Sequence, residues 1–271
     1  MLSLIGDPDV GGVVKTRLME KGEEAVALIE AMRYKLPTID SSTVDSILSE
    51  LKESLTMEQF RKLLELPEPP LDKEIFLLTK LMDTECDKES WTSLLEKFSL
   101  EISFELSPDR TDIENVEIFN YIFFSRLKFR CSDTEMKLEE CALINRVLDS
   151  KNGNPVAVSI IYFMLSISVG LPIYPICFSG GFIPACINKQ GEVSFYLNVF
   201  KNGAIFSKEN FKNIPGLAEL DDADMSVGKE GALASIYVEM LAFVYENTNC
   251  SYKKPLLEEI RLLIGEGRKF L

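Results

Sequence analysis

The amino-acid sequence predicts an α+β fold with a helical N-terminal part, a small antiparallel sheet, and further helices at the C-terminus. Two observations carry this prediction. Before Leu171, apolar residues recur at the three- and four-residue spacing of amphipathic helices. After Leu171 they gather in short runs separated by turn sequences such as Lys201-Asn202-Gly203, which is typical of antiparallel strands.

Short helices with polar joints form the predicted N-terminal part. Asp7 and Pro8 supply a cap and a first-turn proline for a helix that should end at Gly22. Together with the next helix, at 23–35, it resembles one HEAT-type helical hairpin. Further helices are predicted at 42–54, 57–66, 72–82, 89–106 and 111–126.

The second half begins with a short helix at 141–150, closed by a turn at Lys151-Asn152-Gly153. After a short helix from Ser207 to Phe211, helices at 229–246 and 255–264 complete the fold, the last ending at Gly265. The strands that precede them are predicted at 171–178, 181–187, 193–200 and 204–206.

We expect two parts in the chain, a helical leader over 1–108 and a second, sheet-bearing part over 109–271. The single tryptophan, Trp91, has the spacing of a core residue in the leader, and we expect it to be buried.

The chain is strongly acidic. Of 271 residues, 29 are Lys or Arg and 43 are Asp or Glu, which gives a formal net charge of −14. Such a charge repels nucleic acid and anionic membrane surfaces unless basic residues are locally concentrated, and the sequence reveals no basic patch. We therefore expect neither a nucleic-acid partner nor a membrane partner.

The sequence predicts a reduced, cytoplasmic protein. The region after Met1 lacks the features of a signal peptide, and no uninterrupted apolar stretch reaches the roughly 18 residues of a membrane span. The cysteines form no CxxC pair, so neither a disulfide nor a metal or other cofactor is expected. They are Cys86, Cys131, Cys141, Cys177, Cys186 and Cys250.

Histidine is absent from the whole chain. Histidine is the usual general base near neutral pH and the commonest metal ligand. A Ser/His or Cys/His mechanism within a single chain is therefore excluded.

The stretch LINRVLDSKNGNPVAVSIIYFMLSISVGLPIYPICFSGGF, followed by YLNVFKNGAIFSKENF, resembles the transglutaminase-like superfamily, in particular its bacterial SirB-type branch. This resemblance extends from about Leu143 to Phe211. It implies a transglutaminase-like core in which a helix beginning at the nucleophile packs on an antiparallel sheet that carries the other catalytic residues.

In catalytic members of the family a cysteine opens the helix, where the helix dipole can lower the pKa of its thiol, and His and Asp follow on the strands. The resemblance places these three positions at Pro155, Gly181 and Asn198. Gly181 stands where the branch commonly has His in Pro-Gly-His-Phe, and Asn198 stands where it has Asp. The resemblance thus implies an inactive family member.

We expect this protein to use its old cleft, its core or its leader as a binding or regulatory module for an unidentified protein partner. One alternative is a thiol hydrolase or acyltransferase rebuilt around Cys177 or Cys186, and another is a structural subunit of a homo-oligomer. Ser159 is expected to bond to the backbone or to pack. The candidate cleft residues are Asn154, Pro155, Ser159, Cys177, Gly180, Phe182, Cys186 and Phe200.

Overall fold

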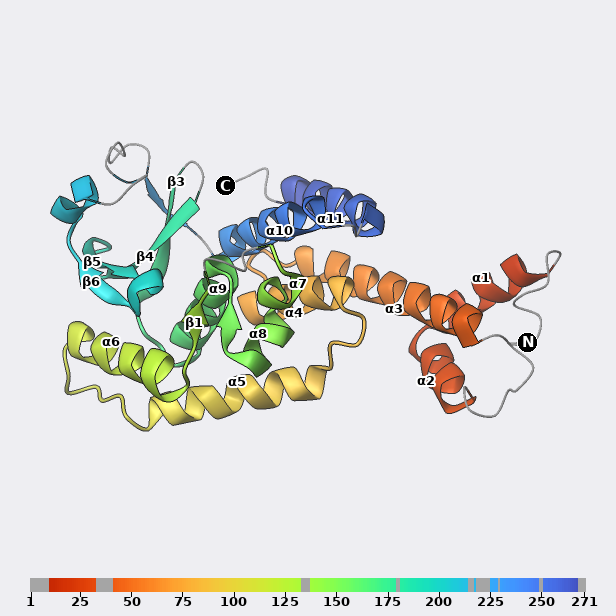
Figure 1. Ribbon diagram of the computed structural model, residues 1–271, viewed down its shortest axis with the longest axis horizontal. Helices are drawn as coiled ribbons and strands as arrows, with labels where there is room; N and C mark the ends of the chain where they lie inside the picture. The colour runs from red at the N-terminus through yellow and green to blue at the C-terminus, as the bar shows by residue number, and fades with distance from the viewer. Residues whose placement is uncertain are drawn as a thin grey trace.

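The computed structural model confirms the α+β prediction: a small antiparallel sheet packs against a larger group of helices (Figure 1). The sheet lies at one end of the molecule, and the N-terminal helices lie at the other (Figure 1). The structure describes residues 10–32, 41–132, 137–178, 181–213, 217, 225–228, 230–248 and 251–267.

The first three helices are α1 (Gly11–Lys21), α2 (Glu23–Met32) and α3 (Ser41–Leu64). Gly22, at a φ of 60°, ends α1 as predicted. The predicted start at Asp7 and Pro8 lies outside the described residues. The prediction of two helices at 42–54 and 57–66 is wrong, because no Gly or Pro interrupts the chain between them and α3 runs through both.

Four elements follow before the first short strand: α4 (Leu71–Met82), α5 (Lys88–Ser103), α6 (Asp112–Asn120) and the π-helix η3 (Tyr121–Arg126). Thr111 and Glu114 form a capping box that starts α6. Trp91 is only 4% exposed and packs edge-on against Phe76, so the expectation that it is a core residue is confirmed.

The middle of the chain contains α7 (Glu139–Ala142), α8 (Ile144–Ser150) and the buried helix α9 (Pro155–Ser168). Two strands that the sequence did not predict, β1 (Arg130–Cys131) and β2 (Asn152–Gly153), pair in parallel just before α9. Each is only two residues long, too short for an alternating pattern to be recognised.

The five-stranded sheet has the order β6-β5-β4-β3-β7, and all neighbouring strands are antiparallel. The predicted strands at 181–187 and 204–206 are confirmed. The strand bounds are β3 (Ile173–Phe178), β4 (Gly181–Ile187), β5 (Val193–Asn198), β6 (Ala204–Phe206) and β7 (Ser226–Val227). The predicted strand at 193–200 stops at Asn198, where the one-turn 3-10 helix η4 (Val199–Lys201) begins.

The C-terminal helices are α10 (Glu230–Glu246) and α11 (Lys254–Gly267), preceded by the 3-10 helices η5 (Lys208–Asn213) and η7 (Ser251–Lys253). The prediction that the last helix ends at Gly265 is wrong, because α11 continues through that glycine. Within the part of the chain that the structure describes, no helix has the length and apolar character needed to cross a bilayer.

Of three clusters of buried apolar residues in the described part of the chain, two organise the helices, and the third lies on the sheet and η5. The larger joins the end of α3, α4, α5 and α6 with α9, α10, α11 and one face of the sheet. The smaller joins only α1, α2 and the first half of α3. Packing therefore groups α4 and α5 with the sheet-bearing part, and the boundary we expect at residue 108 stays a prediction.

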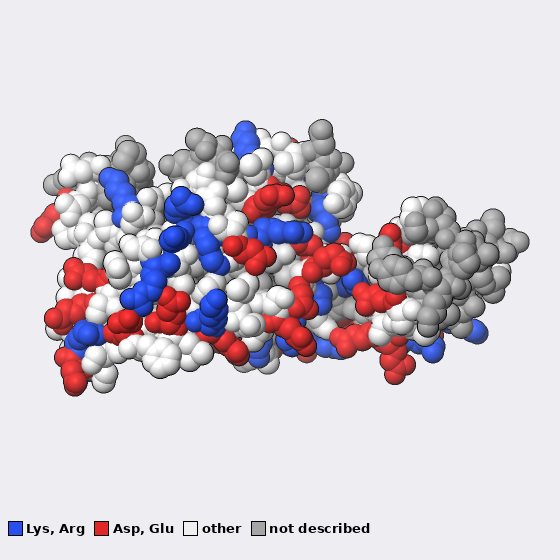
Figure 2. All heavy atoms as spheres, turned by 60° about the horizontal axis from the view of Figure 1, so that its bottom comes forward, with Lys and Arg blue, Asp and Glu red and all other residues white. Residues whose placement is uncertain are grey.

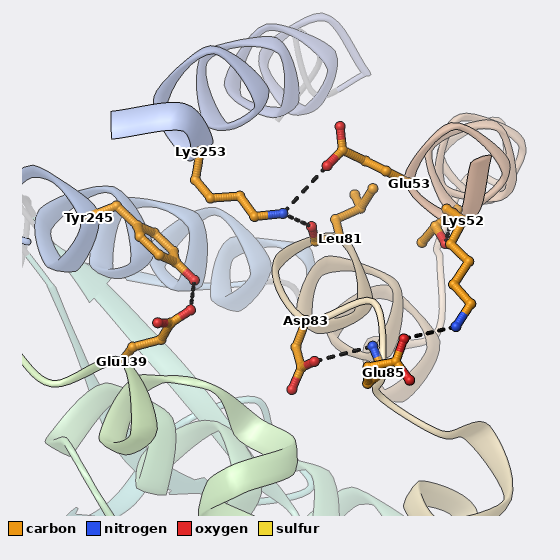
Figure 3. A network of polar contacts seen from close by, with 9 residues as sticks. Lys52, Glu53, Leu81, Asp83, Glu85, Glu139, Tyr245 and Lys253 are labelled. Atoms are coloured by element: carbon orange, nitrogen blue, oxygen red, sulfur yellow. Dashed lines mark hydrogen bonds and ion pairs between the residues drawn. The ribbon is translucent and has the colours of Figure 1, made fainter. Parts of the chain in front are cut away.

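A polar network holds the C-terminal segment against α3 and α4 (Figure 3). The ammonium group of Lys253 is buried; it donates to the carbonyl oxygen of Leu81 at 2.9 Å and lies 3.4 Å from Glu53 (Figure 3). A cation at the last carbonyls of α4 is favourable because those groups carry the negative end of the helix dipole. Nearby, the Tyr245 hydroxyl donates to Glu139 at 2.5 Å (Figure 3).

Candidate functional site

The N-terminus of α9 is fixed by Asn154, which is 1% exposed. Its Oδ1 accepts a hydrogen bond from the Ala157 N–H at 2.9 Å, and its own N–H donates to the Cys141 carbonyl at 2.7 Å. Pro155 occupies the first helical position, where a missing N–H does no harm. Asn154 is thus a helix cap beside the site and does not line the pocket described next.

A pocket of about 330 Å³ lies where α9 begins, β4 begins and β5 ends. Pro155, Gly181 and Asn198, the three positions matched to the catalytic triad, all line it. They come from α9, β4 and β5, and the sheet register brings them to one place. Gly180, the neighbouring candidate residue, lies outside the described residues.

The pocket wall is mostly apolar and carries no ionisable side chain among its described residues. Phe182 packs on Phe163 of α9, with ring centroids 5.6 Å apart, and forms part of the inner wall. Phe200 lines the pocket while 61% exposed, which places this ring at the rim. The site is therefore suited to an apolar group and offers no acid or base for proton transfer.

Ser159 contributes a hydroxyl group to the pocket wall. It lies one turn after Pro155, is 4% exposed, and makes no hydrogen bond with any residue that the structure describes. Of the two roles expected for Ser159, a bond to the backbone or packing, the structure shows packing: the side chain is buried, and its hydroxyl bonds to no described residue. By contrast, Ser166 on the same helix donates to the Phe163 carbonyl at 2.9 Å. The Ser159 hydroxyl is free to bond a ligand.

Asn198 is held in place by the turn that follows β5. Its Oδ1 accepts a hydrogen bond from the Lys201 N–H at 3.1 Å, which starts η4. Its amide nitrogen makes no hydrogen bond to the rest of the described chain, so the pocket has a second neutral polar group.

The register of β3 and β4 decides where the two candidate cysteines lie. Cys177 of β3 is opposite Phe182, and Cys186 of β4 is opposite Ile173. Because Ile173 and Cys177 are four residues apart on β3, their side chains lie on the same face, and the side chain of Cys186 lies on that face too. Neither is among the residues that line the pocket.

Neither thiol is activated. Burial, with a smaller contribution from the charge of Asp112, raises the pKa of the Cys186 thiol to about 11. Burial also raises the pKa of Cys177. A reactive cysteine has a lowered pKa, so both thiols have shifted in the opposite direction.

The sequence did not identify several residues that line the pocket. Phe178, Ile183, Pro184 and Phe206 belong to predicted strands, but strand alternation alone could not show which of them border the site. Ile236 comes from α10, far along the chain, and no local pattern connects it to α9. In the described part of the chain, no group of three or more Cys, Asp or Glu side chains has the geometry to hold a metal ion.

Comparison with known proteins gives one result. A family model described as the transglutaminase-like superfamily matches residues 89–225, about half of the chain. The match covers every pocket residue except Ile236. No curated protein and no solved structure gives a significant match.

Proposed function

The chain belongs to the transglutaminase-like superfamily, and on this premise we propose that its pocket is a family active site that has lost its chemistry and binds a protein partner. The observation that carries the proposal is the convergence of Pro155, Gly181 and Asn198 on one apolar pocket. None of these residues is a nucleophile or a general base, and the chain has no histidine to replace one.

We also assign the chain to the SirB-type branch. The assignment is supported by the sequence Gly153-Asn154-Pro155 at the start of α9 and by the sequence Ser179-Gly180-Gly181-Phe182, whose last two residues begin β4. In that branch the nucleophile position, which Pro155 occupies here, commonly lacks a cysteine. The absence of a nucleophile at Pro155 is therefore a feature of the branch. Gly181 in place of His and Asn198 in place of Asp are further departures of this chain from the branch pattern.

A protein ligand fits the pocket better than a reacting small molecule. Its volume lies at the lower end of small-molecule sites and is enough for an anchoring side chain. The exposed ring of Phe200 at the rim offers apolar surface outside the pocket, which an extended partner would cover. Ser159 and Asn198 supply neutral hydrogen-bonding groups for the partner's backbone.

The thiol-enzyme alternative has less support, because Cys177 and Cys186 lie outside the pocket wall and their pKa values are raised. The oligomer alternative predicts self-association that depends on protein concentration, and analytical ultracentrifugation distinguishes it from partner binding.

The proposed function is tested by selecting a phage-displayed library of random peptides on the wild-type protein and on a variant whose pocket is filled, Ser159→Leu. A matched control, Ser93→Leu, places the same side chain on an exposed position of α5. We expect peptides that bind the wild type and the Ser93→Leu variant but not the Ser159→Leu variant.

A second pair of variants tests whether any loss of binding comes from the pocket and not from misfolding. Phe200→Ser removes the exposed ring from the rim, and Phe104→Ser removes a ring that is 85% exposed on the segment after α5. The selected peptides should bind Phe200→Ser more weakly and Phe104→Ser normally. Selection of no peptide, or of peptides that bind all variants alike, would overturn the proposal.

A further inference from the structure

The fold assembles a basic patch that no segment of the sequence contains. Its members come from four places: Lys97 on α5, Lys128 and Arg130 at the start of β1, Lys151 before β2, and Lys201 at the end of η4. We call these five residues the β1 basic patch. The sequence alone could not indicate this patch, because long-range contacts bring its residues together.

The contacts around Lys151 bring the patch together. Its ammonium nitrogen lies 4.1 Å from the ring centroid of Phe98 and 5.1 Å from that of Phe129. Those rings are sequence neighbours of Lys97 on one side and of Lys128 and Arg130 on the other. The backbone closes the group, because the Arg130 N–H donates to the Lys151 carbonyl at 2.8 Å.

The patch continues to the mouth of the pocket. The Cys131 thiol approaches the Val199 carbonyl at 3.9 Å, so β1 lies beside η4. Lys201, at the end of η4, follows directly after Phe200 on the pocket rim. On the other side, β2 pairs with β1 and leads through Asn154 into Pro155, which lines the pocket.

Four of the five basic side chains of the patch have no carboxylate partner among the described residues, and the fifth, Lys151, donates to the Leu148 carbonyl. Lys97, Lys128, Arg130 and Lys201 take part in no ion pair or side-chain hydrogen bond with the described residues. By contrast, Lys52, Arg126 and Arg261 each contact carboxylates. Figure 2 shows basic side chains gathered on one part of a face that otherwise carries many acidic ones.

Lys151 is the half-buried member of the patch. Burial lowers its pKa to about 8, the nearby carboxylate of Asp149 opposes this shift, and the positive charge of Lys97 adds to it. An anion placed over the patch would favour the charged form of Lys151 and would also offset the repulsion between neighbouring cations.

Building on the proposed function, we propose that the partner is an acidic peptide segment: an apolar side chain enters the pocket, and carboxylates next to it contact the β1 basic patch. Charge complementarity favours this occupant because the patch is unpaired and lies beside the pocket mouth. A nucleic acid is the poorer candidate, since the rest of the chain repels polyanions and the neighbouring pocket is shaped for one apolar group.

The test uses two triple variants that remove the same charge. The patch variant carries Lys97→Gln, Arg130→Gln and Lys201→Gln. The control carries Lys73→Gln, Lys88→Gln and Lys189→Gln, which are exposed lysines without ion pairs among the described residues. Lys128 is left unchanged so that both variants remove three positive charges.

Peptides selected on the wild-type protein, as described above, serve as the probe, and fluorescence anisotropy gives their affinity for each variant. We expect the peptides to be rich in Asp and Glu around an apolar residue. The patch variant should bind them roughly tenfold more weakly, since three surface charge contacts are lost, and the control should bind as the wild type does. Added salt should weaken binding to the wild type more than to the patch variant.

The outcomes separate this inference from the proposed function. Peptides that need the pocket but bind the patch variant as tightly as the wild type would overturn the acidic-partner inference and leave the proposed function standing. Failure to select any pocket-dependent peptide would overturn both. Patch-dependent binding of single-stranded DNA, or of vesicles containing phosphatidylserine, without selection of acidic peptides would also overturn the inference.

Discussion

Two serines of α9 provide a matched test of whether the Ser159 hydroxyl serves the fold or a ligand. Ser159 and Ser166 are 4% and 0% exposed, and both face the buried side of the same helix. Ser166 donates to the Phe163 carbonyl at 2.9 Å, whereas Ser159 has no hydrogen-bond partner among the described residues. The substitution Ser→Ala is therefore expected to affect the two positions differently.

The size of the difference follows from the bond that only Ser166 makes. A typical hydrogen bond contributes about 1 kcal/mol to stability after exchange with water. Alanine is the better helix former by roughly 0.5 kcal/mol at both positions. Ser166→Ala should thus lower the free energy of unfolding by about 0.5 kcal/mol, and Ser159→Ala should raise it by about 0.5 kcal/mol.

Urea unfolding followed by tryptophan fluorescence measures both variants. Trp91 is the single tryptophan, it is buried, and it belongs to the larger core cluster, so its signal reports unfolding of that core. The expected separation between the variants is about 1 kcal/mol. Ser159→Ala destabilising the protein as much as Ser166→Ala would show that Ser159 makes a structural bond, and the reasoning about a ligand-facing hydroxyl would fail.

Gly203 and Gly170 have nearly the same positive φ, 74° and 73°. A Cβ added at Gly203 would lie 2.3 Å from the side-chain amide of Asn120, whereas a Cβ at Gly170 would meet no atom within 4 Å. Gly203→Ala should therefore lower the melting temperature clearly more than Gly170→Ala. Because burial lowers the pKa of Lys151 to about 8 from 10.5, the unfolded state binds more protons between these values. The free energy of unfolding of the wild type, measured against Lys151→Met, should therefore rise with pH through that window, and a flat or falling difference would contradict the burial of Lys151. Because the pKa of Cys186 is raised to about 11, iodoacetamide should alkylate this thiol near pH 8 about two orders of magnitude more slowly than a free thiol. Mass spectrometry measures the alkylation rate. Fast alkylation would favour the thiol-enzyme alternative.

Local patterns in the sequence were enough to predict most of the fold. Turn sequences bound the strands β4 and β6 correctly, and Gly22 marks the end of α1 because its positive φ suits glycine. The predictions failed where local rules gave no signal. The π-helix Tyr121–Arg126 follows an apolar stripe that is equally compatible with an α-helix, and β1 and β2 exist only because distant segments pair.

The candidate site could be predicted in part. Pro155, Gly181 and Asn198 were identified by their places in a motif, and the structure brings all three to one pocket. The free hydroxyl of Ser159 and the burial of Cys186 depend on side-chain surroundings that a sequence pattern does not contain.

The β1 basic patch was missed for a different reason. Its residues are far apart in the sequence, and they meet only through the pairing of β1 with β2 and the packing of Lys151 between Phe98 and Phe129. Counting charges along the chain could therefore not identify this surface.

The most direct test of the central claim, that the family pocket binds a partner, is a methyl NMR titration of isoleucine-labelled protein with a selected peptide. Ile183 and Ile236 line the pocket, whereas Ile29 belongs to the separate N-terminal cluster and Ile264 to α11. The account predicts that the methyl signals of Ile183 and Ile236 shift with peptide concentration while those of Ile29 and Ile264 stay in place. Shifts confined to Ile29 or Ile264, with the pocket signals unchanged, would contradict it.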